Sequence, residues 1–143
     1  MMQKGTHPMR YMMLIYTQEK ESGLTREQAE QLTAAHSAVI EETTRRGMLQ
    51  GAEPLGPTRT ATTVRMKDGR ALIADGPFAE TKEQLAGYYI LECENLDEAI
   101  EWAAKIPTAC KGGAGCIEIR PLPGLPTQSE TEAIAGHAVT LNG

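Results

Sequence analysis

The segment from Asp75 to Glu83 concentrates polar side chains that could do chemistry, and it directly follows a predicted strand. Gly76 precedes Pro77, which favours an extended backbone at the glycine, and the proline ring fixes its own φ. Asp75 is therefore expected to be held by a stiff peptide. A held carboxylate can act as an acid, a base or an orienting group. A turn aspartate, by contrast, only accepts backbone hydrogen bonds, and the sequence leaves both interpretations open.

His36 is the second residue whose type and position suggest chemistry. It lies on the apolar stripe of a predicted helix, one turn from Leu32 and from Ile40, where a polar ring needs a partner. Asp75 is a candidate partner. A carboxylate on one ring nitrogen leaves the other free for proton transfer near neutral pH. His36 and Asp75 are thus a hypothetical catalytic pair, the alternative being that His36 is a packed side chain with its hydrogen bonds satisfied.

Further side chains from the predicted strands and the loop could line a small-molecule pocket. The residues expected to bind a ligand are Tyr16, Pro77, Phe78, Thr81, Lys82 and Tyr88. Side chains alternate along a strand, so at least one of Tyr88 and Tyr89 is expected to be an ordinary core residue. Glu80, Lys82 and Glu83 can equally form a solvated charged face, since surface ion pairs are common and individually weak.

No metal or organic cofactor is expected. The cysteines are Cys93, Cys110 and Cys116, and the histidines are His7, His36 and His137. The cysteines are odd in number and lack paired CxxC spacing, and the histidines lie far apart. This pattern predicts neither a disulfide framework nor a zinc site.

Composition narrows the class of protein. The chain has 143 residues and a net charge of −5, with its 14 lysines and arginines scattered along the sequence. Its length suits one domain, and its charge argues against direct nucleic-acid binding. No apolar run approaches the ~20 residues that cross a bilayer, and no signal peptide is recognisable. We expect a soluble cytoplasmic protein without membrane association.

The helices and strands that must position these residues are predicted from the spacing of apolar residues and from the capping, glycine and proline residues at their ends. Strands are predicted over residues 10–16, 48–55, 60–66, 71–74, 86–93 and 116–120. A long helix should begin at a capping box of Thr25 and Gln28 and end before Gly47. A second helix should begin after Asn95 and end before Pro107. An Asp68-Gly69 pair predicts a tight hairpin, and residues 75–84 a polar loop.

This order predicts an α+β fold, a ferredoxin-like sandwich with βαβ-hairpin-βαβ order and an antiparallel sheet. Two helices can cover only one face of such a sheet. Residues 11–16 and 88–91 are nevertheless apolar on both alternating faces. A second copy of the chain, packed sheet to sheet as a homodimer, is the expected cover for the other face.

The string DGPFAETKEQLAGYYILE, residues 75–92, resembles the signature of the DGPF proteins, which are grouped with the YCII-related family. Residues 10–16, 61–70, 96–107 and 117–122 resemble that family's opening strand, hairpin, second helix and ending. The resemblance implies a domain over residues 9–122. Residues 1–8 would then be an N-terminal extension and 123–143 a mobile C-terminal tail, in which residues 130–139 could form a helix.

The same resemblance implies a ferredoxin-like fold in the dimeric α/β-barrel style and an active site with a histidine and an aspartate, for which His36 and Asp75 are the equivalents here. Three functions follow as expectations. The first is a cofactor-independent acid–base enzyme with a small-molecule pocket at the Asp75 loop. The second is a ligand-sensing regulatory module, since family members occur with sigma factors of the extracytoplasmic type. The third is a structural dimerisation domain.

Overall fold

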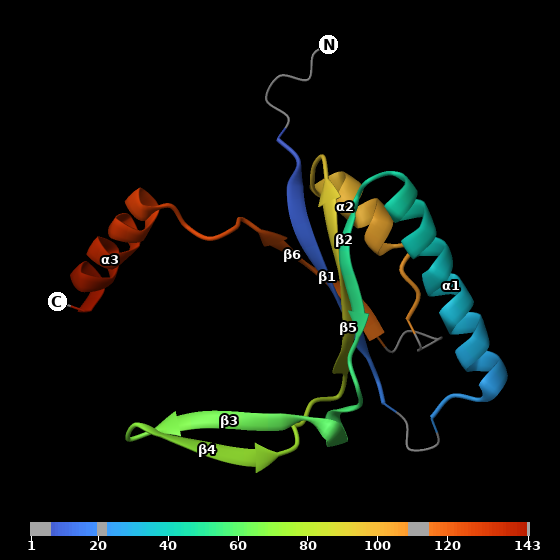
Figure 1. Ribbon diagram of the computed structural model, residues 1–143, viewed down its shortest axis with the longest axis horizontal. Coiled ribbons are helices and arrows are strands. Elements are labelled where there is room, and N and C mark those ends of the chain that lie inside the picture. Colours follow the sequence, from blue (N-terminus) through green and yellow to red (C-terminus); the bar gives the residue numbers. More distant parts are fainter. Residues whose placement is uncertain (1–6, 20–22, 109–114, 143) are drawn as a thin grey trace, which may run out of the picture.

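The computed structural model describes residues 7–19, 23–108 and 115–142, and its elements follow the predicted order closely (Figure 1). In chain order they are β1 (Met9–Thr17), α1 (Arg26–Arg45), β2 (Leu49–Pro54), the 3₁₀ turn η1 (Thr58–Thr60), β3 (Thr62–Lys67), β4 (Arg70–Asp75), β5 (Gln84–Cys93), α2 (Leu96–Ala103), β6 (Gly115–Leu122) and α3 (Gln128–Asn142). Among the described residues, no helix is both long enough and apolar enough to cross a membrane.

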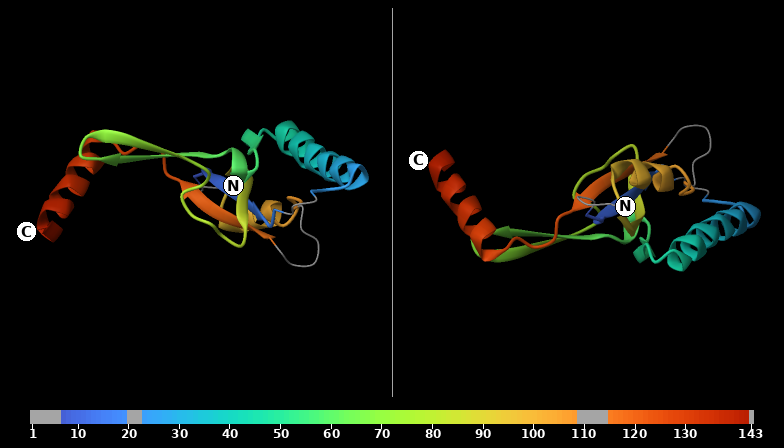
Figure 2. Two further views of the ribbon diagram at one scale, coloured as in Figure 1. Left: turned by 90° about the horizontal axis from the view of Figure 1, so that it is seen from below. Right: turned by 90° about the horizontal axis from the view of Figure 1, so that it is seen from above.

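Four strands form the main sheet in the order β2-β5-β1-β6, and every neighbouring pair is antiparallel. Both α1 and α2 lie on one side of this sheet (Figure 1). The arrangement is mixed α/β and compatible with the predicted ferredoxin-like fold. Strands β3 and β4 form a separate two-stranded sheet, which we call the arm (residues 62–75). The arm and α3 project on the side away from α1, as two further views also show (Figure 2).

The predicted helix ends are confirmed. The Thr25 hydroxyl accepts a hydrogen bond from the Gln28 N–H at 3.1 Å, and the Gln28 side chain accepts one from the Thr25 N–H at 3.0 Å. Together these bonds satisfy donors that a helix start leaves unpaired. Gly47 takes the left-handed conformation, with φ 71°, directly after the helix, and Asn95 caps the second helix by accepting from the Glu98 N–H.

The predicted hairpin is confirmed as well. Asp68 and Gly69, with φ values of 51° and 76°, form the two-residue connection between β3 and β4. Positive φ at both central residues is the geometry of a type I′ turn, whose twist matches that of the paired strands. The sequence did not reveal that this hairpin stands apart from the main sheet.

The core lies between the helices and one face of the main sheet. Every second residue of β1 and of β5 points into it, and Met13 and Leu91 are 0% exposed. The intervening residues lie on the opposite side, which no described helix covers; we call this the open face. It carries Met12, Leu14, Tyr16, Tyr88 and Ile90, all of them partly buried. The prediction that both faces of β1 and β5 are apolar is therefore confirmed.

Gly87 provides a test of how closely β2 and β5 approach. A Cβ atom at this position would lie 2.8 Å from the Glu53 backbone oxygen and 3.2 Å from Pro54 Cα. We expect Gly87→Ala to lower the free energy of unfolding by roughly 1–3 kcal/mol, because backbone has to shift. Urea unfolding, followed by the fluorescence of buried Trp102, measures this.

The matched control is Gly51→Ala on β2. There the nearest atom to the added Cβ is Ile90 Cδ1 at 3.7 Å, an ordinary contact with a flexible side chain. We expect this variant to change stability by about 0.5 kcal/mol or less. Equal effects at the two glycines would contradict the tight approach at Gly87.

Candidate functional site

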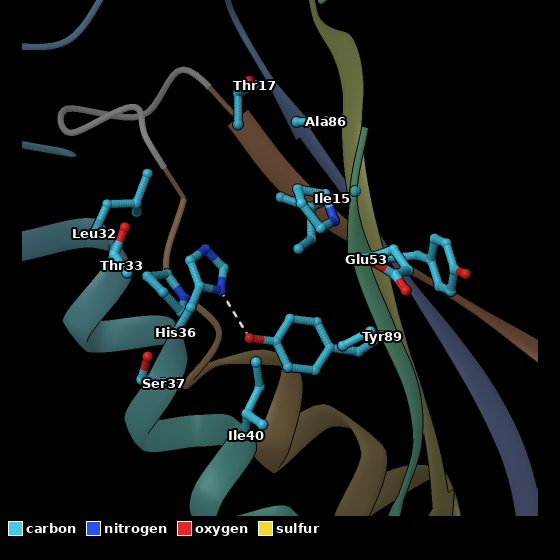
Figure 3. A pocket seen from close by; sticks show the side chains of 15 residues that line it. Ile15, Thr17, Leu32, Thr33, His36, Ser37, Ile40, Glu53, Ala86 and Tyr89 are labelled. Atoms are coloured by element: carbon cyan, nitrogen blue, oxygen red, sulfur yellow. Dashed lines mark hydrogen bonds between the residues drawn. The ribbon is translucent and has the colours of Figure 1, made fainter. Parts of the chain in front are cut away.

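A cavity of about 390 Å³ lies between α1 and the helix-covered side of the sheet. Figure 3 shows its lining side chains, with those of α1 facing those of the sheet across the space. The lining residues are Ile15, Thr17, Leu32, Thr33, His36, Ser37, Ile40, Ala52, Glu53, Pro54, Ala86, Gly87, Tyr88, Tyr89 and Pro107. The helical members recur every three to four residues, so they form one face of α1.

The cavity exists because the sheet carries small residues beneath this part of α1. Ala52 on β2 and Gly87 on β5 lie on the side that faces the helices, where β1 and β5 elsewhere place large side chains. Two neighbouring positions of small volume leave a space that a close-packed interior would otherwise fill. Ala86 extends this small-residue floor toward Thr17 (Figure 3).

His36 and Tyr89 form the polar centre of the cavity. The His36 Nδ1 and Tyr89 Oη atoms are 2.7 Å apart, and the dashed line in Figure 3 marks this hydrogen bond. The two rings are roughly parallel, with centroids 5.9 Å apart and an interplanar angle of 25°. His36 is partly buried, and 2% of Tyr89 is exposed. The contact fixes the histidine ring against the sheet.

Burial sets the protonation of this pair. Removal of water disfavours the charged imidazolium, so the pKa of His36 is lowered below its usual 6.5. The same effect raises the pKa of Tyr89 to about 12, because the phenolate is the disfavoured form. At neutral pH both side chains are therefore uncharged.

Two proton arrangements satisfy the hydrogen bond between these uncharged groups. If Tyr89 Oη–H donates to Nδ1, the proton of His36 sits on Nε2, which can then donate to a ligand. If Nδ1–H donates to Tyr89, Nε2 carries a free lone pair and can accept a proton, while the phenol proton is free to bind a second acceptor. Exchange between the two arrangements is the chemistry of a general acid–base pair.

The cavity walls carry little charge. Glu53 is the one charged residue among the described lining residues, and it pairs in register with Tyr88. This register directs its exposed side chain to the open face, so its backbone is the part that borders the cavity. The polar side chains that remain are hydroxyls and the His36–Tyr89 pair. Such a lining suits a neutral ligand, because an unpaired ion in an apolar site loses its hydration without compensation.

The structure does not bring Asp75 to His36. Asp75 is exposed at the end of β4, pairs in register with Thr62 and is not among the cavity residues. The hydrogen-bond partner of His36 is Tyr89, and not Asp75 as expected. The cavity likewise lies under α1 and not at the Asp75 loop, because the helix and the small residues of the sheet create the space.

The expected ligand-binding residues separate into two groups. Pro77, Phe78, Thr81 and Lys82 are exposed on the connection between the arm and β5, and 77% of Phe78 is exposed. Tyr16 lies on the open face, where its hydroxyl donates to Glu118 Oε1 at 3.3 Å. Tyr88 borders the cavity, but alternation along β5 directs its ring to the open face.

Sequence reasoning did not single out Thr33, Ser37 or Ala86 as site residues. The signal for the first two was their spacing around His36, at one turn before it and directly after it on the same helix. The signal for the floor was the sequence Ala86-Gly87, small residues within an otherwise bulky strand, which marks a close approach of backbone or a ligand space.

Fold and site together define a class of small α+β proteins. Its features are a four-stranded antiparallel sheet, two helices on one face and a cavity beneath the first helix. The family model described as "YCII-related domain" matches residues 9–123, and the chain belongs to this family. It is also similar to an uncharacterised protein of Rhizobium meliloti (strain 1021). The two are 39% identical over 115 residues, which cover 80% of this chain and 92% of the relative.

The partial burial of His36 predicts a pH dependence of stability. The pKa is lowered in the folded state, so the unfolded chain takes up this proton first as the pH falls. The contribution of His36 is complete above about pH 6.5 and declines as the pH falls toward the lowered folded-state pKa. His36→Asn should remove this part of the decline, as urea unfolding of both proteins from pH 7.5 to 5.5 measures.

Nuclear magnetic resonance titration of the His36 ring provides the direct check, with Asp75→Asn as the control. We expect the control to leave the His36 titration unchanged, since Asp75 is not among the residues that surround the ring. A His36 pKa at or above 6.5, or a clear response to Asp75→Asn, would contradict this arrangement.

Proposed function

We propose that this protein binds a small, uncharged and largely apolar molecule in the cavity beneath α1, and that His36 and Tyr89 act on it as an acid–base pair. The observation that carries the proposal is the hydrogen bond of 2.7 Å between partly buried His36 and buried Tyr89, two uncharged titratable groups in a mostly apolar cavity. A pocket with apolar walls and a few convergent polar groups is the usual form of a small-molecule site.

The dimensions support a ligand of modest size. About 390 Å³ lies near the lower end of the range for small-molecule pockets, roughly 300–1,000 Å³. Apolar contacts with Leu32, Ile40 and Ile15 would supply most of the binding free energy. Thr33 and Ser37, one turn and one residue from His36, also line the cavity, and their hydroxyls would orient a polar group of the ligand toward the imidazole.

The chemistry would be a proton transfer. With Nδ1 held by Tyr89, His36 Nε2 can remove a proton from a bound carbon or oxygen acid, and the Tyr89 hydroxyl can donate a hydrogen bond as charge develops. The lowered pKa of His36 keeps it in the basic form at neutral pH. In this proposal Asp75 has no catalytic role, because it lies outside the cavity.

Two isosteric probes test the binding site. We expect benzamide, which is neutral, to raise the melting temperature and to shift the His36 ring resonances, and benzoate to do so more weakly because its charge is desolvated without a partner. Ala86→Leu should abolish the benzamide effect by filling the floor. Ala34→Leu, on the exposed side of α1, adds the same side chain and should not.

A metabolite thermal-shift screen on these proteins then separates the functions. Ligands that stabilise the wild type but not Ala86→Leu occupy the cavity, and their turnover is assayed with His36→Asn and Tyr89→Phe. Loss of turnover with retained binding would support the enzyme. Binding without turnover would support a ligand-sensing regulatory module instead. Stabilisation of Ala86→Leu equal to that of the wild type would contradict the site.

We also propose that two copies pair through the open face. The five apolar residues that define this face lack any covering helix among the described elements, and they continue across two hydrogen-bonded strands. Glu118 and Glu53, on the outer strands, lie on either side of the row that Leu14 and Tyr88 form, so charged side chains flank the apolar centre of the face. An isologous contact about a two-fold axis would bury this apolar centre and leave the charges at its rim.

Leu14→Glu tests this pairing. It introduces a carboxylate at the centre of the open face, so we expect the dimer dissociation constant to rise by at least ~10-fold. Sedimentation velocity over a range of concentrations measures this. Gln31→Glu, on the exposed surface of α1, adds the same charge and should leave the association unchanged. A wild type that is monomeric throughout would contradict the pairing.

A further inference from the structure

The arm is an amphipathic ribbon with two different faces. In its register Val64 lies opposite Ile73, and Met66 opposite Ala71, so these four side chains share one side. Arg65, Lys67, Arg70 and Leu72 share the other side by the same register. The first side is thus apolar and the second is basic.

The apolar side of the arm is bare. Val64 is 59% exposed, Met66 is 68% exposed and Ile73 is 71% exposed, which is unusual for paired β-branched and long apolar side chains in a strand. A two-stranded ribbon is also marginally stable by itself. Both facts indicate that the arm packs on another surface when the protein is assembled.

Hydrogen bonds hold the base of the arm, and they set the direction in which it leaves the main sheet. The Gly76 N–H donates to the Ala61 oxygen at 2.7 Å, and the Thr63 hydroxyl donates to the Gly76 oxygen at 2.8 Å. Nearby, the Glu19 carboxylate accepts from the N–H and the hydroxyl of Thr58 at 2.9 and 2.8 Å. Glu19 lies just after β1 and Thr58 just before the arm, so these two bonds tie the approach to the arm to the main sheet.

We infer that the arm is a clasp that packs its apolar side on a second copy of this chain, an inference that rests on the proposed pairing through the open face. The arm projects on the side of that face (Figures 1 and 2). Its six-residue strands span about 20 Å, whereas packed sheets lie about 10 Å apart. An arm of this length reaches past a partner sheet and can hold its flank.

The area that a stable dimer requires favours this occupant. The five open-face side chains are already partly buried by their neighbours, so only part of their surface is left for a contact. A stable interface needs about 800 Å² from each partner. Because a two-fold axis brings in two arms, the bare apolar sides of both would supply much of the difference.

Photo-crosslinking tests the contact itself. p-Benzoylphenylalanine replaces Met66 on the apolar side or, as the matched control, Leu72 on the basic side, in a mixture of ¹⁴N- and ¹⁵N-labelled full-length chains. We expect Met66 to give covalent dimers whose linked peptides carry both isotopes, and Leu72 to give several-fold fewer. Links from Met66 confined to its own chain, or equal yields at the two positions, would overturn the clasp.

Paired variants separate the clasp from the sheet pairing. Val64→Thr with Ile73→Thr alters the apolar side but keeps β-branched residues in the strands, so we expect a dimer dissociation constant at least ~10-fold higher. Leu72→Thr with Ala74→Thr, on the other side, should stay within about twofold. Circular dichroism and thermal unfolding check that all variants fold.

Each remaining outcome decides between the two contacts. If the Val64/Ile73 variant dimerises like the wild type while Leu14→Glu does not, the sheet pairing stands and the clasp is overturned. If the Val64/Ile73 variant is monomeric while Leu14→Glu still dimerises, the clasp stands and the pairing falls. A further outcome would also overturn the clasp. In it, the protein binds a 20-base-pair DNA duplex, Arg65→Gln with Arg70→Gln abolishes this binding, and the Val64/Ile73 variant dimerises like the wild type.

Discussion

Strands β1 and β5 are apolar on both faces, and the rest of the molecule is organised around this constraint. Met13 and Tyr89 are register partners on the side of the helices, and Leu14 and Tyr88 are register partners on the other side. Backbone pleating makes this division unavoidable, because successive side chains point to opposite faces. The first side becomes the core and contains the cavity. The second remains uncovered by the described helices, which is why we look for a partner there.

The cavity is a local exception to the packing that this core otherwise achieves. Met13 and Leu91 are fully buried, yet Gly87, further along β5, and Ala52, on the neighbouring strand β2, leave space beneath α1. Empty volume and a desolvated histidine both oppose folding, since each removes favourable contacts or hydration that a filled core would keep. Places where a sequence departs from its own packing rules are characteristic of functional sites. The cavity therefore has a stronger claim to function than any exposed loop of this chain.

Local signals allowed much of the fold to be predicted. The Thr25–Gln28 capping box, Gly47 after the helix and the Asp68-Gly69 turn depend on residues close in sequence, and all three are found in the structure. The hairpin was predicted, but its separation from the main sheet was not, because strand propensity does not say which further strands a hairpin pairs with. Pairing is set by tertiary contacts such as those at Ala61 and Gly76.

The site was only half predictable for the same reason. His36 was identified from its place on an apolar helical stripe, which is a property of one segment. Its partner lies 53 residues away on β5. Two adjacent tyrosines occupy that strand, and alternation alone establishes that one faces the core without saying which. The register of β5 against β1 decides in favour of Tyr89, because its opposite residue, Met13, faces the helices.

The segment from Asp75 to Glu83 has a structural role, because it joins the arm to β5 in a fixed conformation. Gly76 has φ 95°, a conformation that L side chains rarely adopt, and its N–H and carbonyl both hold the base of the arm. Further along, the Thr81 hydroxyl and the Gln84 amide bond to backbone carbonyls of the same turn, and Gln84 also accepts from the Glu19 N–H. These bonds return the chain from the arm to β5 in one fixed register. Because β5 carries Tyr89, a segment that lies outside the cavity helps to determine which ring meets His36.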